Sequence, residues 1–327
     1  MIRFFRNSYI IQYVIIAILA ILLWVPSFIT CNVDVAYRSP VTPLYNLLAD
    51  LLDFWPYALL LFAFLLNAFE ALFFNSILAS NQIINKVSTL GAVSFLLLMN
   101  MTPAQTTFYP VLLAAVFLLM FIHTVFSIYQ TPRPELYLLN AGFYLSFATM
   151  CWFPSLLLAL WGIIALGIIH KGSLRLHLIP FIGLLLPYFF YFAVHFLMGD
   201  LMPRLLAYGN FFSSIDLTLQ GFGWFDVGLV AFLLLVVNMP LLMPRNYSFE
   251  KTLAVRTKIT MTILLLLFGI FLLVLGGNPM QSGVLFLALS ILFSYELAYL
   301  DGLRWSNVTF AVFLLAVLAF HYYPLFV

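Results

Sequence analysis

The chain has 327 residues, of which 65% are hydrophobic and 18% are aromatic, while only 7% carry a charge. Soluble domains are about a quarter charged and roughly half apolar, so this composition excludes a water-soluble fold. The net charge of +2 includes no basic block and no nucleic-acid-binding motif, so we expect membrane lipid, and no nucleic acid, as a partner.

Continuous apolar stretches of about twenty residues are long enough to cross the hydrocarbon core of a bilayer as helices. Backbone groups in lipid must be paired internally, and runs that do not alternate exclude a barrel. The sequence therefore predicts an all-α, polytopic transmembrane bundle that forms one integral membrane domain over residues 1–327. We expect about eleven spans, at residues 9–29, 55–80, 87–101, 109–129, 137–152, 154–169, 178–198, 225–243, 259–275, 281–300 and 308–323.

The first span follows Arg3 and Arg6 and continues to Ile29. It is too long for a signal peptide, so we interpret it as an uncleaved helix. Basic residues in short loops stay on the cytoplasmic side and set the orientation of the spans. An N-in, C-out arrangement places all thirteen Lys and Arg residues inside except Arg38 and Arg204, and it is therefore the orientation that we predict.

The connection after the first span, VDVAYRSPVTPLYNLLADLLDFWP, contains Asp34, Asp50 and Asp53. Thr42 fits a helix N-cap and Pro43 the first helical position. Leucines then recur at the spacing of one helix face, with Asp50 and Asp53 opposite, which predicts a short amphipathic helix at the outer surface. These carboxylates either solubilise that helix or take part in chemistry, and Asp34 is the candidate general base.

Glu70 lies near the middle of the second span, one helical turn after Asn67. A charged side chain at that depth costs about 2.5–3.5 kcal/mol on insertion scales. Such residues usually face the bundle interior or a wet cavity and are candidates for function. His123, in the fourth span, is a candidate partner of Glu70. Two interpretations stay open, a role in transport and a neutral Glu70 that fixes helix packing.

The second long external connection, GDLMPRLLAYGNFFSSIDLTLQGFGW, places Asp200 and Arg204 four residues apart. The planar guanidinium of Arg204 is suited to clamp a lipid phosphate, with Arg38 as a second candidate. The alternative is an ordinary surface ion pair between Arg204 and Asp200. Aromatic residues that follow, among them Tyr208 and Phe211, are typical of interface anchors.

The stretch NAGFYLSFATMCWFPSLLLALWGIIALGIIHKGSLRLHLIPFIGLLLPYFFYFAVHFLM, residues 140–198, resembles a family of bacterial polytopic membrane proteins. More distantly, it is similar to the GT-C superfamily of polyprenyl-phosphate-dependent membrane glycosyltransferases. A small-residue helix, a short turn, a second apolar helix and the basic turn HKGSLR carry this resemblance. The likeness extends over about the first two thirds of the chain, through apolar patterns of low specificity.

The resemblance implies a glycosyltransferase that uses a polyprenyl-phosphate-linked sugar at the external face of the bacterial inner membrane. It assigns Asp34 as base or as ligand of a divalent cation, with Asp50 and Asp53 as further acidic candidates. It assigns Arg204, and more loosely Arg38, to the donor phosphate. The sequence leaves two alternatives open, a non-enzymatic subunit that binds a protein partner in a cell-envelope assembly, and a transporter or flippase.

Overall fold

The computed structural model describes residues 2–6, 9–30, 38–84, 88–129, 131, 134–169, 174–213, 253–276, 282–299 and 304–322. In these ranges every regular element is a helix, which confirms the all-α prediction. By length and composition, five helices are able to cross a bilayer. They are α2 (Ile10–Thr30), α4 (Pro56–Ser80), α6 (Pro110–Ile128), α9 (Leu174–Met198) and α12 (Leu253–Gly276).

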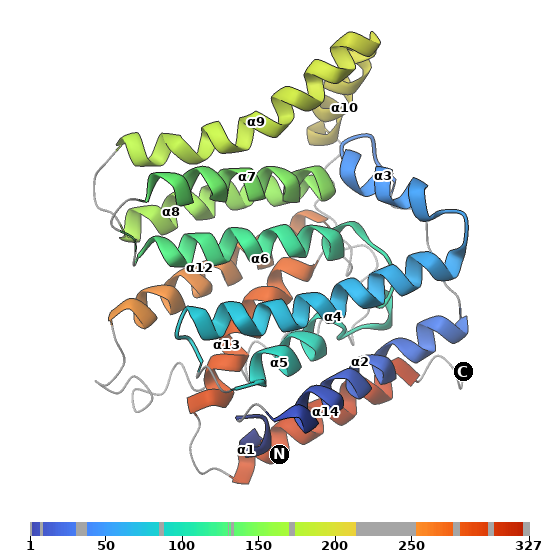
Figure 1. The fold of residues 1–327 in the computed structure, drawn as a ribbon, viewed down its shortest axis with the longest axis vertical. Coiled ribbons are helices and arrows are strands. Elements are labelled where there is room, and N and C mark those ends of the chain that lie inside the picture. Colours follow the sequence, from blue (N-terminus) through green and yellow to red (C-terminus); the bar gives the residue numbers. More distant parts are fainter. Residues whose placement is uncertain are drawn as a thin grey trace.

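The remaining helices are shorter or less apolar. They are α1 (Ile2–Phe5), α3 (Pro43–Leu52), α5 (Leu90–Met99), α7 (Glu135–Cys151), α8 (Leu158–Ile169), α10 (Leu201–Ser213), α13 (Gly283–Tyr299), α14 (Arg304–Tyr322) and the 3-10 turns η2 (Pro103–Gln105) and η3 (Phe153–Leu157). In Figure 1 the long helices lie side by side, with α4 and α6 running in one direction and α2, α9 and α12 in the other. The expected span at 225–243 lies outside the described residues, and the number of crossings stays a prediction.

The expected third span, 87–101, is short for a bilayer crossing, and in the structure it is broken. Its helix, α5, has ten residues and is therefore about 15 Å long, half of the hydrocarbon thickness of a bilayer. The apolar run ends at Met99, and Asn100 caps α5 where the chain leaves the helix. The segment from Met101 to Tyr109 is mostly buried, and the 3-10 turn η2 is its one regular element. A short helix and an irregular segment thus replace one continuous span.

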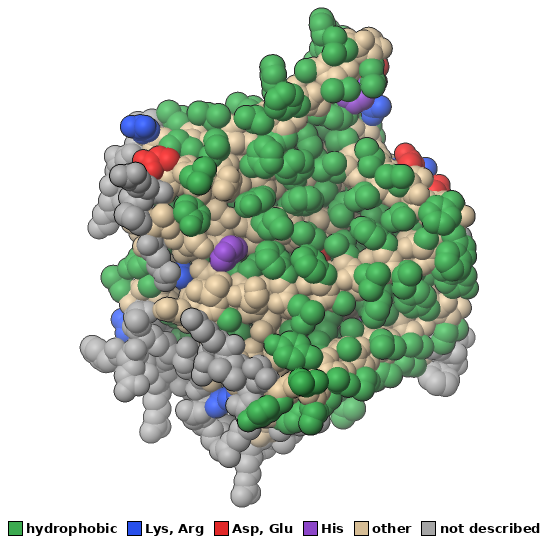
Figure 2. All heavy atoms as spheres, in the orientation of Figure 1, with side chains coloured by type: hydrophobic (Ala, Val, Ile, Leu, Met, Phe, Trp, Pro, Cys, Tyr) green, Lys and Arg blue, Asp and Glu red, His purple; other side chains and the backbone are tan. Residues whose placement is uncertain are grey.

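The surface of the bundle is apolar over most of the face shown in Figure 2. Large exposed side chains lie on α2, α4 and α9, among them Ile10, Ile18, Leu65, Phe69, Leu185 and Phe189. A soluble protein rarely exposes so large an apolar patch, whereas lipid solvates it well. The long apolar helices and this surface are those of a membrane-embedded protein.

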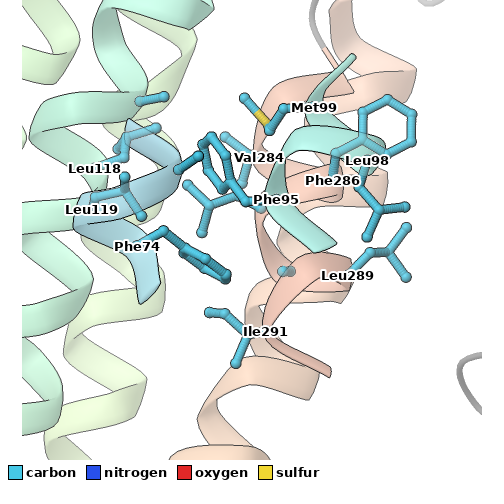
Figure 3. Packing of buried hydrophobic residues seen from close by; sticks show 14 of the residues in the cluster. Phe74, Phe95, Leu98, Met99, Leu118, Leu119, Val284, Phe286, Leu289 and Ile291 are labelled. Atoms are coloured by element: carbon cyan, nitrogen blue, oxygen red, sulfur yellow. The ribbon is translucent and has the colours of Figure 1, made fainter. Parts of the chain in front are cut away.

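The core lies where α5 and α13 pass between the outer helices. All ten residues of α5 are buried. Figure 3 shows side chains of α4, α5 and α13 meeting there, and the rings of Phe74 and Phe95 have centroids 5.1 Å apart. Lipid is as apolar as these side chains, so close packing stabilises the helix contacts more than removal from water does.

Two glycines bring α7 and α9 into backbone contact. A methyl group on Gly142 would collide with the carbonyl oxygen of Pro180, and one on Gly183 with that of Leu139. Small residues allow membrane helices to approach this closely. The contact holds α9 against the bundle and so fixes the direction in which the end of α9 points.

The bundle has two ends, which we name by the short helices that lie there. At the α1 end, Phe5 O accepts a hydrogen bond from Thr89 N at 2.9 Å, and Asn81 O accepts one from Lys258 Nζ at 3.0 Å. At the α3 end lie the last residues of α2 and α9 and the start of α4 (Figure 1). The described charged candidates of both external connections, Arg38, Asp50, Asp53 and Arg204, lie at the α3 end.

Candidate functional site

The short helix α3 forms as the sequence predicts. It begins at Pro43 after Thr42, although the Thr42 hydroxyl donates to Ser39 O at 3.0 Å and does not cap the helix. Tyr45 anchors α3 to the bundle, because its ring stacks on Phe108 with centroids 5.0 Å apart. The Tyr45 hydroxyl also donates to Phe108 O at 3.2 Å. The helix is therefore held firmly at the α3 end.

The leucines of α3 divide between the bundle and the surface. Three of them pack against the core: Leu44, Leu48 and Leu52. Leu47 and Leu51 point outward and are 55% and 63% exposed. Because Tyr45 and Ala49 take the central buried positions, the stripe is rotated and two leucines become free to meet lipid.

Arg38 joins both acidic residues of α3. Its Nη1 lies 3.2 Å from Asp50 Oδ1, and its Nη2 donates to Asp53 Oδ2 at 2.7 Å. The hydrogen bond with Asp53 is the main reason that the pKa of Arg38 rises above its ordinary value. All three side chains are well exposed, and exposed ion pairs contribute little to stability. This arrangement agrees with a solubilising role for Asp53.

A glycine turn between α9 and α10 assembles a second polar group. Gly199 has a φ of +80°, which glycine adopts without strain, and this turn brings Asp200 back onto His195. His195 Nδ1 donates to the two carboxylate oxygens of Asp200 at 2.8 and 3.0 Å. Arg204 Nε lies 3.6 Å from the same carboxylate. The hydrogen bond from His195 is the main cause that lowers the pKa of Asp200.

Aromatic rings support this group from behind. The ring of Tyr191 meets that of His195 with centroids 4.5 Å apart. In α10, Tyr208 and Phe211 pack edge-on against Phe153, with centroids 5.2 and 5.0 Å apart. These contacts fix α10 to the end of the bundle and hold Arg204 in place.

An open groove of about 640 Å³ lies between α3 and the junction of α9 and α10. Its walls are formed by Pro43, Asn46, Leu47, Asp50, Leu51, Tyr191, His195 and Arg204. Figure 2 shows acidic, basic and histidine side chains at this edge of an otherwise apolar face. The groove combines a carboxylate, an imidazole and a guanidinium with apolar walls, which suits an amphiphile with an anionic head.

The structure brings some of the sequence candidates together and separates others. Asp50 and Arg204, from the two external connections, line the same groove. Asp53 and Arg38 pair beside it, and neither forms its wall. Asp34 lies outside the described residues, so its expected role stays a prediction.

Sequence reasoning placed neither His195 nor Tyr191 among the site candidates. The signal was present in HFLMGD, because a glycine after a helix commonly adopts positive φ and folds the next residues back on the last turn. Asp200 N indeed donates to His195 O at 3.1 Å. That turn predicts the contact between the Asp200 and His195 side chains, although not the groove in which they lie.

The intramembrane candidates divide into two places. Glu70 is fully buried, and Asn67, one turn earlier, accepts a hydrogen bond from Asn100 Nδ2 at 2.8 Å. The expected pairing of Glu70 with His123 is wrong. His123 Nδ1 lies 3.0 Å from Asn81 Nδ2, at the α1 end of α4. Glu70 lies about three helical turns before Asn81 on α4, so Glu70 and His123 lie at different depths in the bundle.

Within the described ranges, no three His, Cys, Asp or Glu side chains lie close enough to hold a metal ion. The divalent cation implied by the resemblance stays a prediction. Comparison of the chain with models of known protein families, with curated proteins and with solved structures gave no match.

Proposed function

We propose that the groove between α3 and the α9–α10 junction binds a polyprenyl-phosphate-linked sugar, and that this protein is a GT-C-like membrane glycosyltransferase. The supporting observation is the convergence of Asp50, His195 and Arg204 on one open groove with apolar walls. α9 leads from this groove along the bundle with its apolar side chains exposed. A prenyl chain can therefore lie along α9 in the lipid while its phosphate reaches the groove.

Arg204 is the proposed phosphate ligand. In the part of the chain that the structure describes, its one ion-pair contact runs from Nε to Asp200. Both terminal nitrogens therefore remain to donate to two phosphate oxygens, the geometry in which arginine binds phosphate best. Asp200 in turn restrains the guanidinium so that it is held ready for the ligand.

The transfer step needs a base for the acceptor hydroxyl and an anion site for the leaving group. In the proposed step, Asp50 takes the hydroxyl proton while the hydroxyl oxygen bonds to the anomeric carbon of the sugar. The bond between that carbon and the phosphate oxygen breaks, and Arg204 holds the polyprenyl phosphate that leaves. Hydrogen bonding to Asp200 fixes the proton on His195 Nδ1, so Nε2 is a second proton acceptor in the groove.

The same proposal places the groove outside the cell. Arg38 and Arg204 lie at the α3 end, whereas Arg6 follows α1 and Arg175 and Arg256 lie near the starts of α9 and α12, all at the α1 end. The positive-inside rule then makes the α1 end cytoplasmic. α10 ends at the α3 end and α12 begins at the α1 end, which supports a crossing at 225–243, eleven crossings altogether and an N-in, C-out orientation in the bacterial inner membrane.

The test is a mass-spectrometric profile of lipid-linked sugars and surface glycans in a deletion strain. The strain is complemented with wild type, Asp50→Asn, Arg204→Gln or Arg175→Gln. Arg175→Gln is the matched control, because it removes an exposed arginine from the α1 end of α9. We expect a sugar that is missing from the deletion strain to return with wild type and with the control, but not with the groove variants. Identical profiles in all strains would contradict the proposal.

A further inference from the structure

The half-length helix α5 ends inside the bundle, beside a buried carboxylate. Asn100, which caps α5, donates to Asn67 Oδ1 from Nδ2 at 2.8 Å. Asn67 lies eleven residues into α4, about 16 Å from its first residue, so this contact is near the middle of the bundle. Non-helical backbone occurs at this depth only where protein buries it or where it lines a cavity.

The polar side chains around this point form one group, which we name the Glu70 cluster. Its members are Asn67, Glu70, Asn100, Tyr109 and His321, all at most 1% exposed. His321 Nε2 donates to Asn100 O at 2.6 Å, and Tyr109 lies close enough to Glu70 to feel its charge. Helices α4, α5, α6 and α14 or their ends thus contribute to one buried site.

The Glu70 cluster concentrates unpaired polar atoms. Among the described residues, the following buried atoms of the cluster have no hydrogen-bond partner: Asn67 Nδ2, Glu70 Oε1 and Oε2, Asn100 Oδ1, Tyr109 Oη and His321 Nδ1. Buried polar atoms in native proteins are nearly always paired, with protein, water or an ion. Most of these atoms are oxygens, and two of them belong to one carboxylate.

We propose that the Glu70 cluster binds one sodium ion, enclosed within the bundle. Hard cations take oxygen ligands, and Glu70, Asn100 Oδ1 and Tyr109 Oη supply them. One carboxylate balances one positive charge, which fits a monovalent ion. The carboxyl end of α5 adds the negative end of a helix dipole. Ends of interrupted helices near the bilayer midplane are used by membrane proteins to bind sodium ions and protons.

A proton on Glu70 fits the unpaired atoms less well. A carboxylic acid adds one hydrogen-bond donor, which pairs with one oxygen of the cluster at a time. A sodium ion contacts several oxygens at once and satisfies them together. This inference is independent of the proposed glycosyl transfer, because no residue of the cluster lines the groove.

Glu296 provides a matched control. It is the other buried glutamate in the described chain, 6% exposed, and its Oε1 also has no hydrogen-bond partner. It lies on α13 near the α1 end, away from Asn67 and Asn100. Replacing either glutamate by glutamine removes one buried carboxylate and keeps the size of the side chain.

The test measures binding of radioactive sodium to the purified full chain in lipid nanodiscs, with choline keeping the ionic strength constant. We expect saturable binding of one ion per chain for wild type and for Glu296→Gln, and no binding for Glu70→Gln. Asn100→Ala removes one ligand and should weaken binding at least about tenfold. Absence of saturable binding to wild type, or equal binding to Glu70→Gln, would overturn the proposal.

Thermal unfolding separates a sodium site from a proton site and does not depend on any variant. Because sodium binds only the folded chain, we expect the unfolding temperature of wild type to rise with sodium at fixed pH and then to level off. An unfolding temperature that follows pH but not sodium would show that a proton neutralises Glu70, and would overturn the assignment to sodium.

Discussion

The groove at the α3 end and the Glu70 cluster place polar side chains in opposite surroundings. Around the groove the carboxylates are exposed and paired, as in the contacts of Asp50 with Arg38 and of Asp200 with His195. In the cluster, Glu70 is buried and its oxygens are unpaired. An exposed pair can exchange its partner for a ligand at small cost, whereas a buried carboxylate needs a permanent partner. The groove therefore suits turnover, and the cluster suits a tightly held ion.

Gly142→Ala should disturb the groove and leave the Glu70 cluster in place. The added methyl meets the backbone of α9, so we expect unfolding to become easier by about 1–3 kcal/mol and α9 to move away from the groove. Gly167→Ala is the control, since nothing lies within 4 Å of its added methyl. Thermal unfolding of both variants measures the difference. Sodium binding should survive in Gly142→Ala, because α7 and α9 contribute nothing to the Glu70 cluster.

The effect of Glu70→Leu on the unfolding temperature should depend on the cation in the buffer. Removing a buried charge that lacks a partner stabilises a protein by up to about 1–4 kcal/mol. In choline buffer we therefore expect Glu70→Leu to unfold at a higher temperature than wild type. With saturating sodium this advantage should shrink, because wild type then gains the bound ion. A variant less stable than wild type in both buffers would show that Glu70 is already satisfied.

Gly199→Ala should disturb the groove and spare the cluster. At a φ of +80° an alanine costs about 1–2 kcal/mol, and relief of this strain moves Asp200 away from His195. The matched control is Gly209→Ala in α10, where no atom lies near the added methyl and helix propensity improves. Binding of a polyprenyl phosphate should weaken in the first variant only. Equal binding in both would remove Asp200 from the proposed site.

The smallest effect should come from acid. Hydrogen bonding to His195 lowers the pKa of Asp200 below its ordinary 3.8 in the folded chain. Its stabilising contribution is therefore complete above that ordinary value and is lost as the pH falls through the lowered one. Since Asp200 is exposed, we expect Asp200→Asn to lose only a slight acid-dependent step in unfolding. If Asp200→Asn retained a large acid-dependent loss of stability, that loss would belong to another titrating group.

Local features of the site could be predicted from the sequence, because they depend on residues a few positions apart. Thr42, Pro43 and the leucine spacing predicted α3, and the spacing of Asp200 and Arg204 predicted their contact. The groove joins α3 to α9, which are distant in sequence, and no local pattern encodes that contact. Asp50 and Arg204 were therefore both candidates without any sign that they share one site.

Two features inside the bundle differ in what the sequence could predict. The end of α5 has local signals, because Asn100 and Pro103 are residues that commonly end a helix. The pairing of Glu70 with His123 assumed that two polar residues in neighbouring spans meet. Helix tilt and register decide that contact, and they place His123 beside Asn81 instead.

The most direct measurement of the central claim is native mass spectrometry of the purified chain with a polyprenyl-phosphate-linked sugar. The account predicts that wild type and Arg175→Gln retain the lipid and that Arg204→Gln loses it. With an acceptor present, wild type should release polyprenyl phosphate, whereas Asp50→Asn should hold the donor unchanged. Equal retention by Arg204→Gln and wild type would contradict the assignment of the groove as the donor site.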